Sequence, residues 1–88
     1  MDISDTDIKS AAKTFILEEF LQGENPDALN DSTRMISSGV LDSIATVRLV
    51  AFLEERFGIE LEAHEMSADS LDTLPDIASI VQAKRKGR

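Results

Sequence analysis

The sequence predicts an all-α protein: a small four-helix bundle of three main helices and one short helix, with a long loop between the first two helices. Apolar residues recur at the three- and four-residue spacing of a helix along most of the chain, and the alternation typical of strands is absent. Only four glycines and two prolines interrupt 88 residues. We expect a single domain over 1–88, because this length supports one modest core.

The first helix is expected to run from about Asp5 to Leu21. Ser4 is a suitable N-cap, and Asp7, three residues later, gives a variant of the capping box. The apolar stripe of this helix consists of Ile8, Ala12, Phe15, Ile16 and Phe20. Gly23 is expected to end the helix, because glycine tolerates the left-handed conformation found at helix C-termini.

Residues 24–41 form the long connection, which is rich in Asn, Asp, Ser and Gly. Connections of this length in compact domains are usually functional or partly ordered. Five apolar residues should pack it onto the core: Leu29, Met35, Ile36, Val40 and Leu41.

The second helix is expected over residues 43–57, with Asp42 as N-cap and Gly58 as the left-handed stop. An extended link with apolar anchors at Ile59 and Leu61 should follow it.

A short third helix is expected near residues 68–72, with Ser67 as its cap. The fourth runs from about Pro75 to Lys84, with Thr73 and Asp76 at capping-box spacing. Its inward residues are Ile77, Ile80 and Val81.

The net charge is −8, with a pI of about 4.4, and the basic residues are concentrated at the end of the chain. Residues 84–88 form a basic tail that is expected to fray. The rest of the chain, residues 1–83, holds five basic and 17 acidic side chains, a net charge of −12. This body repels phosphate backbones, so no nucleic acid is expected as a partner. It favours partners with basic surfaces, although solubility alone also explains acidity of this kind.

Cysteine is absent, which excludes a disulfide scaffold and a cysteine-based metal site. Any thiol that the protein uses must therefore come from a cofactor. The first residues are acidic and polar rather than a signal peptide, and no apolar run approaches membrane-spanning length. We expect a cytoplasmic monomer that does not bind membranes.

The second helix carries two apolar rows rather than one. The first row has the spacing of a core face and consists of Thr46, Leu49, Val50, Leu53 and Phe57. The second row, Ile44, Val47 and Ala51, lies farther round the helix. Spacing alone leaves two interpretations equally open: the long loop packs on this row, or the row is an exposed surface for docking a partner.

Ser43 stands at the first position of this helix, where its hydroxyl should point into solvent beside free backbone N–H groups. A phosphate ester at this oxygen would lie where the helix dipole favours an anion. The alternative is that Asp42 and Ser43 serve only as capping residues.

The string Asp42-Ser43-Ile44, together with residues 45–61, closely resembles the acyl carrier protein family around its attachment serine. The resemblance implies that a separate transferase moves 4′-phosphopantetheine from coenzyme A onto Ser43, with Asp42 and Ile44 read by that enzyme. The thiol of the arm would then carry acyl or aminoacyl groups as thioesters. Implied partners are the phosphopantetheinyl transferase, an acyl- or aminoacyl-activating enzyme, and downstream synthases or transferases. The outer face of the helix would dock these enzymes through Ile44, Val47, Arg48, Ala51, Glu54 and Glu55.

Fatty-acid carriers usually have acidic residues soon after the serine, where this chain has Ala45 and Arg48. We therefore expect a freestanding specialised carrier of the D-alanyl, peptidyl or polyketide type rather than the housekeeping carrier of fatty-acid synthesis.

The sequence indicates no catalytic residues and no metal site. His64, the only histidine, lies far along the chain from Ser43, so a serine hydrolase is not supported. The pairs 18–19 and 54–55 are adjacent on helices and diverge, so they are solvated charges rather than an acid–base pair. The remaining alternative is an unmodified interaction domain that binds a partner helix through the Ile44, Val47 and Ala51 row.

Overall fold

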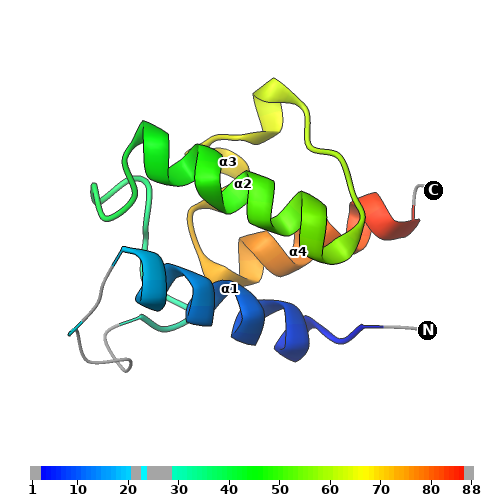
Figure 1. The fold of residues 1–88 in the computed structure, drawn as a ribbon, viewed down its shortest axis with the longest axis horizontal. Helices are drawn as coiled ribbons and strands as arrows, with labels where there is room; N and C mark the ends of the chain where they lie inside the picture. Colours follow the sequence, from blue (N-terminus) through cyan, green and yellow to red (C-terminus); the bar gives the residue numbers. More distant parts are fainter. Residues whose placement is uncertain (1–2, 21–22, 24–28, 87–88) are drawn as a thin grey trace.

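The computed structural model describes residues 3–20, 23 and 29–86, and all the regular structure in these ranges is helical. The helices are α1 (Asp5–Glu19), α2 (Ser43–Phe57), α3 (Ala68–Leu71) and α4 (Leu74–Lys86), with the single 3-10 turn η2 (Ala63–Glu65) between α2 and α3. The predicted all-α fold with three main helices and one short helix is confirmed. Figure 1 shows the three main helices lying along the long axis of the molecule.

The start of α1 is as predicted and its end is not. The Ser4 hydroxyl accepts a hydrogen bond from the Asp7 backbone N–H at 3.1 Å, which satisfies one free donor of the first turn. The helix ends at Glu19, because the backbone of Phe20 leaves helical geometry with φ −124° and ψ −22°. Gly23 has the expected positive φ of 87°, but it lies beyond the helix rather than at its last turn. Leu21, the predicted last residue, lies outside the described residues.

The long connection packs on the core through most of the apolar residues predicted to do so. Leu29, Met35 and Leu41 are buried, and Ile36 is half-buried. Val40 was expected to join them, but it is 37% exposed.

The boundaries of α2 match the prediction at both ends. The Asp42 carboxylate accepts a hydrogen bond from the Ala45 backbone N–H at 2.8 Å and caps the first turn. Gly58 has φ 65° and ψ 40°, a left-handed conformation that glycine adopts without a steric penalty. The buried residues of the helix include the whole predicted core row.

The segment after α2 contains a helical turn that the sequence analysis placed in an extended link. Ile59 and Leu61 are buried anchors as predicted, but η2 follows them. The cause is a capping box in which the Glu65 carboxylate accepts from the Glu62 backbone N–H at 2.9 Å.

The two C-terminal helices differ slightly from their predicted limits. Ser67 is the N-cap residue of α3, although its side chain makes no capping hydrogen bond, and the helix ends one residue before Asp72. The Thr73 hydroxyl accepts from the Asp76 backbone N–H at 3.2 Å and caps α4. The helix extends through Lys86, so residues 84–86 of the predicted tail are helical, whereas residues 87–88 lie outside the described residues.

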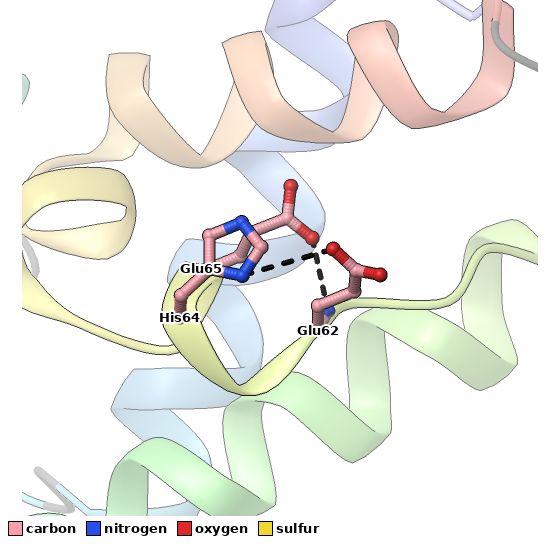
Figure 2. A group of neighbouring side chains, drawn as sticks. All are labelled: Glu62, His64 and Glu65. Atoms are coloured by element: carbon pink, nitrogen blue, oxygen red, sulfur yellow. Dashed lines mark hydrogen bonds and ion pairs between the residues drawn. The ribbon is translucent and has the colours of Figure 1, made fainter.

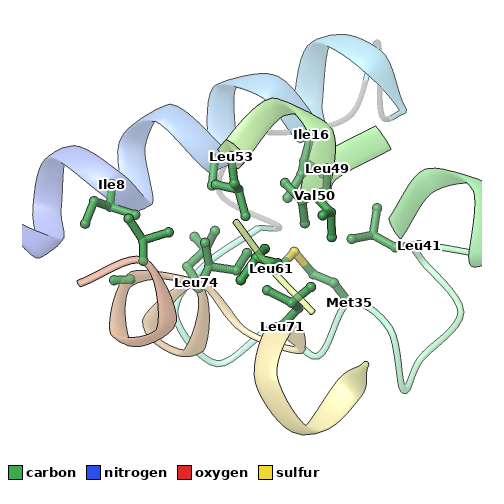
Figure 3. Packing of buried hydrophobic residues seen from close by; sticks show 14 of the residues in the cluster. Ile8, Ile16, Met35, Leu41, Leu49, Val50, Leu53, Leu61, Leu71 and Leu74 are labelled. Carbon is green, nitrogen blue, oxygen red and sulfur yellow. The ribbon is translucent and has the colours of Figure 1, made fainter. Parts of the chain in front are cut away.

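One apolar core joins all these elements, and α1 packs chiefly against α4. Figure 3 shows Met35 and Leu41 of the connection in the same cluster as Leu49 and Val50 of α2 and Leu71 of α3. The connection is thus held against the bundle just before α2 begins. None of the helices in the described ranges combines the length and the apolar character needed to span a membrane.

Candidate functional site

Ser43 is exposed at the first position of α2, as the sequence analysis required. The backbone N–H groups of a helix's first turn have no partner within the helix, and the helix dipole makes this end positive. The Asp42 carboxylate caps the Ala45 N–H, and no further acidic side chain lies in the first turn of α2. The hydroxyl of Ser43 therefore lies where a phosphate ester would be favoured.

Asp42 holds the start of α2 in place through two hydrogen bonds. Its carboxylate accepts from the Ala45 backbone N–H, and its carbonyl oxygen accepts from the Thr46 hydroxyl at 2.8 Å. Thr46 is only 6% exposed, so this second bond ties the start of the helix to the protein interior. The backbone on both sides of Ser43 is held in place, while its side chain is left free to react.

A shallow groove opens beside Ser43. It is formed by the loop before α2, the first two turns of α2 and the residue after η2, and its lining includes Ile36, Gly39, Leu41, Thr46, Val47 and Met66. The apolar character of this lining suits a flexible organic arm better than a metal ion or a polar substrate.

The second apolar row of α2 faces solvent. Ile44 is 71% exposed and Val47 60% exposed, and Ala51 is also exposed. The interpretation in which the long loop covers this row is therefore wrong, and the interpretation in which the row is a solvent-facing surface is confirmed.

The charged residues expected on this face have different surroundings. The Arg48 side chain is 61% exposed, and its guanidinium lies 3.9 Å from the Glu19 carboxylate of α1. Glu55 is exposed. Glu54 is half-buried, and its carboxylate accepts a hydrogen bond from the Leu61 backbone N–H at 2.9 Å. Glu54 thus also holds the link after α2 against the helix.

The loop that leads into Ser43 is bound to Asp72, a residue that the sequence analysis did not select. Asp72 is 4% exposed, and its carboxylate accepts from the backbone N–H groups of Ile36 and Ser37 at 2.8 and 2.9 Å. The hydrogen bond from the Ser37 backbone is the main cause that holds the pKa of the Asp72 carboxyl below its ordinary value, although burial opposes it. No local pattern signals this contact, because 35 and 36 residues separate the partners.

His64 lies apart from Ser43, in a cluster with Glu62 and Glu65 that Figure 2 shows at η2. Its ring nitrogen Nδ1 lies 3.7 Å from the Glu62 carboxylate, and its side chain is 75% exposed. In the described part of the chain, no hydrogen bond or ion pair joins His64 to Ser43. In the described ranges, His64 is thus paired with Glu62 and not placed as the base of a serine hydrolase at Ser43.

The same three side chains place their ligand atoms within 4.8 Å of one another, which is close enough for a metal ion. One of these three side chains already pairs with a cation, because the Lys84 ammonium lies 2.6 Å from the Glu65 carboxylate. The hydrogen bond from the Glu62 backbone, followed by the one from Lys84, holds the pKa of Glu65 below its ordinary value. The hydrogen bond to Glu65 in turn raises the pKa of Lys84. This ion pair ties η2 to α4, and we assign no metal to the cluster.

Comparison with known proteins identifies the family of the chain. Residues 16–83 match the family described as Phosphopantetheine attachment site. The chain is 33% identical over 70 residues to the D-alanyl carrier protein of Streptococcus sanguinis, a match that covers 80% of this chain and 86% of that protein. It is also 33% identical over 79 residues to the acyl carrier protein of Bdellovibrio bacteriovorus, covering 90% and 96% of the two proteins.

A further match, 35% identical over 83 residues, joins the chain to the non-reducing polyketide synthase AC of Didymella fabae. It covers 94% of this chain and only 3% of that synthase. The chain therefore belongs to the phosphopantetheine-attachment family of acyl carrier proteins, which hold acyl or aminoacyl groups as thioesters on a covalently attached 4′-phosphopantetheine arm.

Proposed function

We propose that Ser43 is the residue that receives the phosphopantetheine arm, and that a phosphopantetheinyl transferase attaches it. The observation that carries this proposal is the exposed hydroxyl at the capped start of α2. The arm's phosphodiester fits this position, because the free N–H groups of the first turn stabilise a negative charge there. The apolar groove beside Ser43 could accept part of the arm between enzyme visits.

The transfer requires the Ser43 hydroxyl to act as a nucleophile towards the phosphate of coenzyme A that bears pantetheine. A new ester bond forms at the serine oxygen, the bond to the nucleotide half breaks, and the hydroxyl proton must be removed. Among the described residues, no side chain hydrogen-bonds to the Ser43 side chain. We therefore propose that the transferase supplies the base and that the carrier contributes a correctly positioned oxygen.

The exposed row of α2 is the proposed docking surface for the transferase and for the enzymes that load and unload the arm. Ile44 and Val47 supply the apolar contact, with Ala51 and Glu55 farther along the helix. Ala45 is buried, so Arg48, which lies 3.9 Å from the Glu19 carboxylate, is the cation of this face nearest to Ser43, while the exposed Asp42 adjoins the serine. A partner that places a neutral or acidic group opposite Arg48 would suit this surface better than one that places a basic group there.

This surface charge supports a specialised role over fatty-acid synthesis, and the relatives include a D-alanyl carrier protein and an acyl carrier protein at the same 33% identity. We propose a dedicated acyl- or aminoacyl-activating enzyme as the partner that loads the arm. Mass analysis of the protein isolated from its native host would identify the cargo, and a long-chain fatty acyl group would contradict the specialised role.

The attachment site is tested by incubating the protein with coenzyme A, magnesium and a broad-specificity phosphopantetheinyl transferase. Intact-mass measurement should show the addition of one arm. The Ser43→Ala variant should show none, whereas Ser79→Ala, a control at another exposed serine on α4, should be modified like the wild type. If the wild type gains no arm, the unmodified interaction domain is the better explanation. If Ser43→Ala still gains one, the attachment residue is wrong.

A further inference from the structure

The seven residues 35–41 form a closed loop directly before the capped start of α2. The Leu41 backbone N–H donates to the Met35 carbonyl oxygen at 2.8 Å, which brings the two ends of the loop together. Met35 and Leu41 are 0% and 2% exposed, so both ends are anchored in the core. Between them, Gly39 has φ 88° and donates to the Ile36 carbonyl oxygen at 3.1 Å, which closes a turn.

Asp72, at the junction between α3 and α4, holds this loop through hydrogen bonds. Its carboxylate receives the Ile36 and Ser37 backbone N–H groups on one oxygen and the Ser37 hydroxyl on the other, at 2.8 Å. Its own carbonyl oxygen accepts from the Met35 backbone N–H at 2.7 Å. A single residue thus binds three consecutive loop residues.

Because Asp72 is buried, its hydrogen bonds should stabilise the loop more than the same bonds would at the surface. The Asp72 side chain is 6% exposed, and the nearest cation, the Arg34 guanidinium, lies 3.8 Å away and is itself 74% exposed. The carboxylate is therefore stabilised mainly by the loop's donors rather than by an ion pair. Removing it would leave the Ile36 and Ser37 N–H groups without their partner in a partly buried place.

The loop borders the attachment site. Ile36, Gly39 and Leu41 line the groove in which Ser43 lies, and only Asp42 separates Leu41 from Ser43. We infer that Asp72 is a positioning residue for modification: by holding the loop of residues 35–41 closed, it presents Ser43 and its groove to the transferase in an ordered form. This inference rests on the proposed attachment at Ser43 and adds a residue that touches neither the serine nor the arm.

The inference predicts a specific kinetic effect. When Asp72 is replaced by alanine, the transferase must order the loop at the moment of binding, so KM should rise and kcat/KM should fall by about tenfold. The kcat should change little, because the bound complex holds the same serine in the same place. Ser37→Ala, which removes only the hydroxyl bond and keeps both backbone bonds, should act in the same direction with a smaller effect.

A loss of stability alone must be separated from this effect. Val81→Ala, at a fully buried position of α4, serves as a control that weakens the core without touching the loop. All variants are compared at a temperature where each is folded, as monitored by circular dichroism. Hydrogen exchange followed by NMR should show faster exchange at the Ile36 and Ser37 amides in Asp72→Ala, with the α1 amides unchanged. Val81→Ala should show neither the selective exchange nor the change in KM.

The possible results separate the proposed attachment at Ser43 from the proposed role of Asp72. If wild type and Val81→Ala are not modified, the proposed attachment at Ser43 fails, while the exchange measurement still decides whether Asp72 orders the loop. If they are modified and Asp72→Ala has the wild-type KM, or loop amides as protected as in the wild type, the positioning role is refuted. If Asp72→Ala does not fold, Asp72→Asn replaces it: the amide oxygen still accepts the backbone bonds but carries no negative charge, and the amide nitrogen can only donate to the Ser37 hydroxyl, so KM should rise by less than tenfold. A wild-type KM in both Asp72→Asn and Ser37→Ala would refute the role.

Discussion

Two residues of α2 allow partner docking and stability to be separated by mutation. Ile44 is 71% exposed, whereas Leu49, five residues further along, is 0% exposed. Ile44→Ala removes three carbon groups, each worth about 0.8 kcal/mol when buried against a partner. Because 71% of the residue is exposed in the free carrier, full covering by a partner would gain about 1.7 kcal/mol from these groups. Ile44→Ala should therefore lower kcat/KM for loading by about 20-fold.

The neighbouring residue gives a graded comparison. Val47 is 60% exposed, and Val47→Ala removes two carbon groups, so the same reasoning gives about 1 kcal/mol and a loss of about fivefold. Neither substitution should change the free energy of unfolding by more than about 0.5 kcal/mol, because both side chains already contact water. Leu49→Ala should lower it by about 2–5 kcal/mol, because a buried side chain leaves a cavity.

The assay pairs urea denaturation with the kinetics of phosphopantetheine transfer on the same samples. The expected result is a crossed pattern: Ile44→Ala and Val47→Ala load slowly at wild-type stability, and Leu49→Ala loads normally once its folded fraction is taken into account. The reasoning is refuted if Ile44→Ala destabilises the fold as strongly as Leu49→Ala, or if it loads at the wild-type rate. The second result would place the docking surface elsewhere.

Three further changes have defined outcomes. Arg48→Glu replaces an exposed cation on the docking face, so loading by a transferase with a basic surface should become about fivefold faster at low salt, and the difference should shrink at high salt. Because the pKa of Asp72 is lowered on folding, its stabilisation is present above the unfolded pKa and is lost as pH falls through the folded pKa. Acid titration of the unfolding free energy should therefore be less steep in Asp72→Asn than in the wild type, and equal slopes would contradict this assignment. Gly58→Ala forces a side chain into the left-handed region at φ 65°, so urea denaturation should show a loss of about 1 kcal/mol.

The features that sequence predicted best are those with a local physical cause. Asp42 and Gly58 define the limits of α2, because each acts within a few residues of the helix end that it caps. Ser4 does the same for α1. The position of Ser43 at a helix start followed from these local rules, whereas its selection as the attachment residue rested on the resemblance of residues 42–61 to acyl carrier proteins.

The features that sequence did not reveal depend on contacts between distant segments. Spacing predicted a second apolar row at Ile44 and Val47 but could not say whether the loop covered it, because the path of that loop is set by its anchors at Met35 and Leu41. The role of Asp72 was hidden for the same reason: all its loop partners are at least 35 residues away. The turn η2 was missed although Glu62 and Glu65 have capping-box spacing, since we interpreted this stretch as an extended link.

The distribution of charge assigns separate roles to long-range attraction and to contact. The chain carries a net charge of −8, yet the docking face after Ser43 presents Ile44, Val47 and Arg48, and the acid beside the serine is the capping Asp42. Screening over about 8 Å at physiological salt limits how far the acidic body acts, so it can raise the rate of encounter with a basic enzyme but adds little once the surfaces meet. Specificity at contact must then come from the apolar pair and from what the partner places opposite Arg48. A carrier built in this way attracts many basic enzymes and retains those whose contact surface tolerates a cation, which is the selectivity that a specialised pathway needs when other carriers share the same cell.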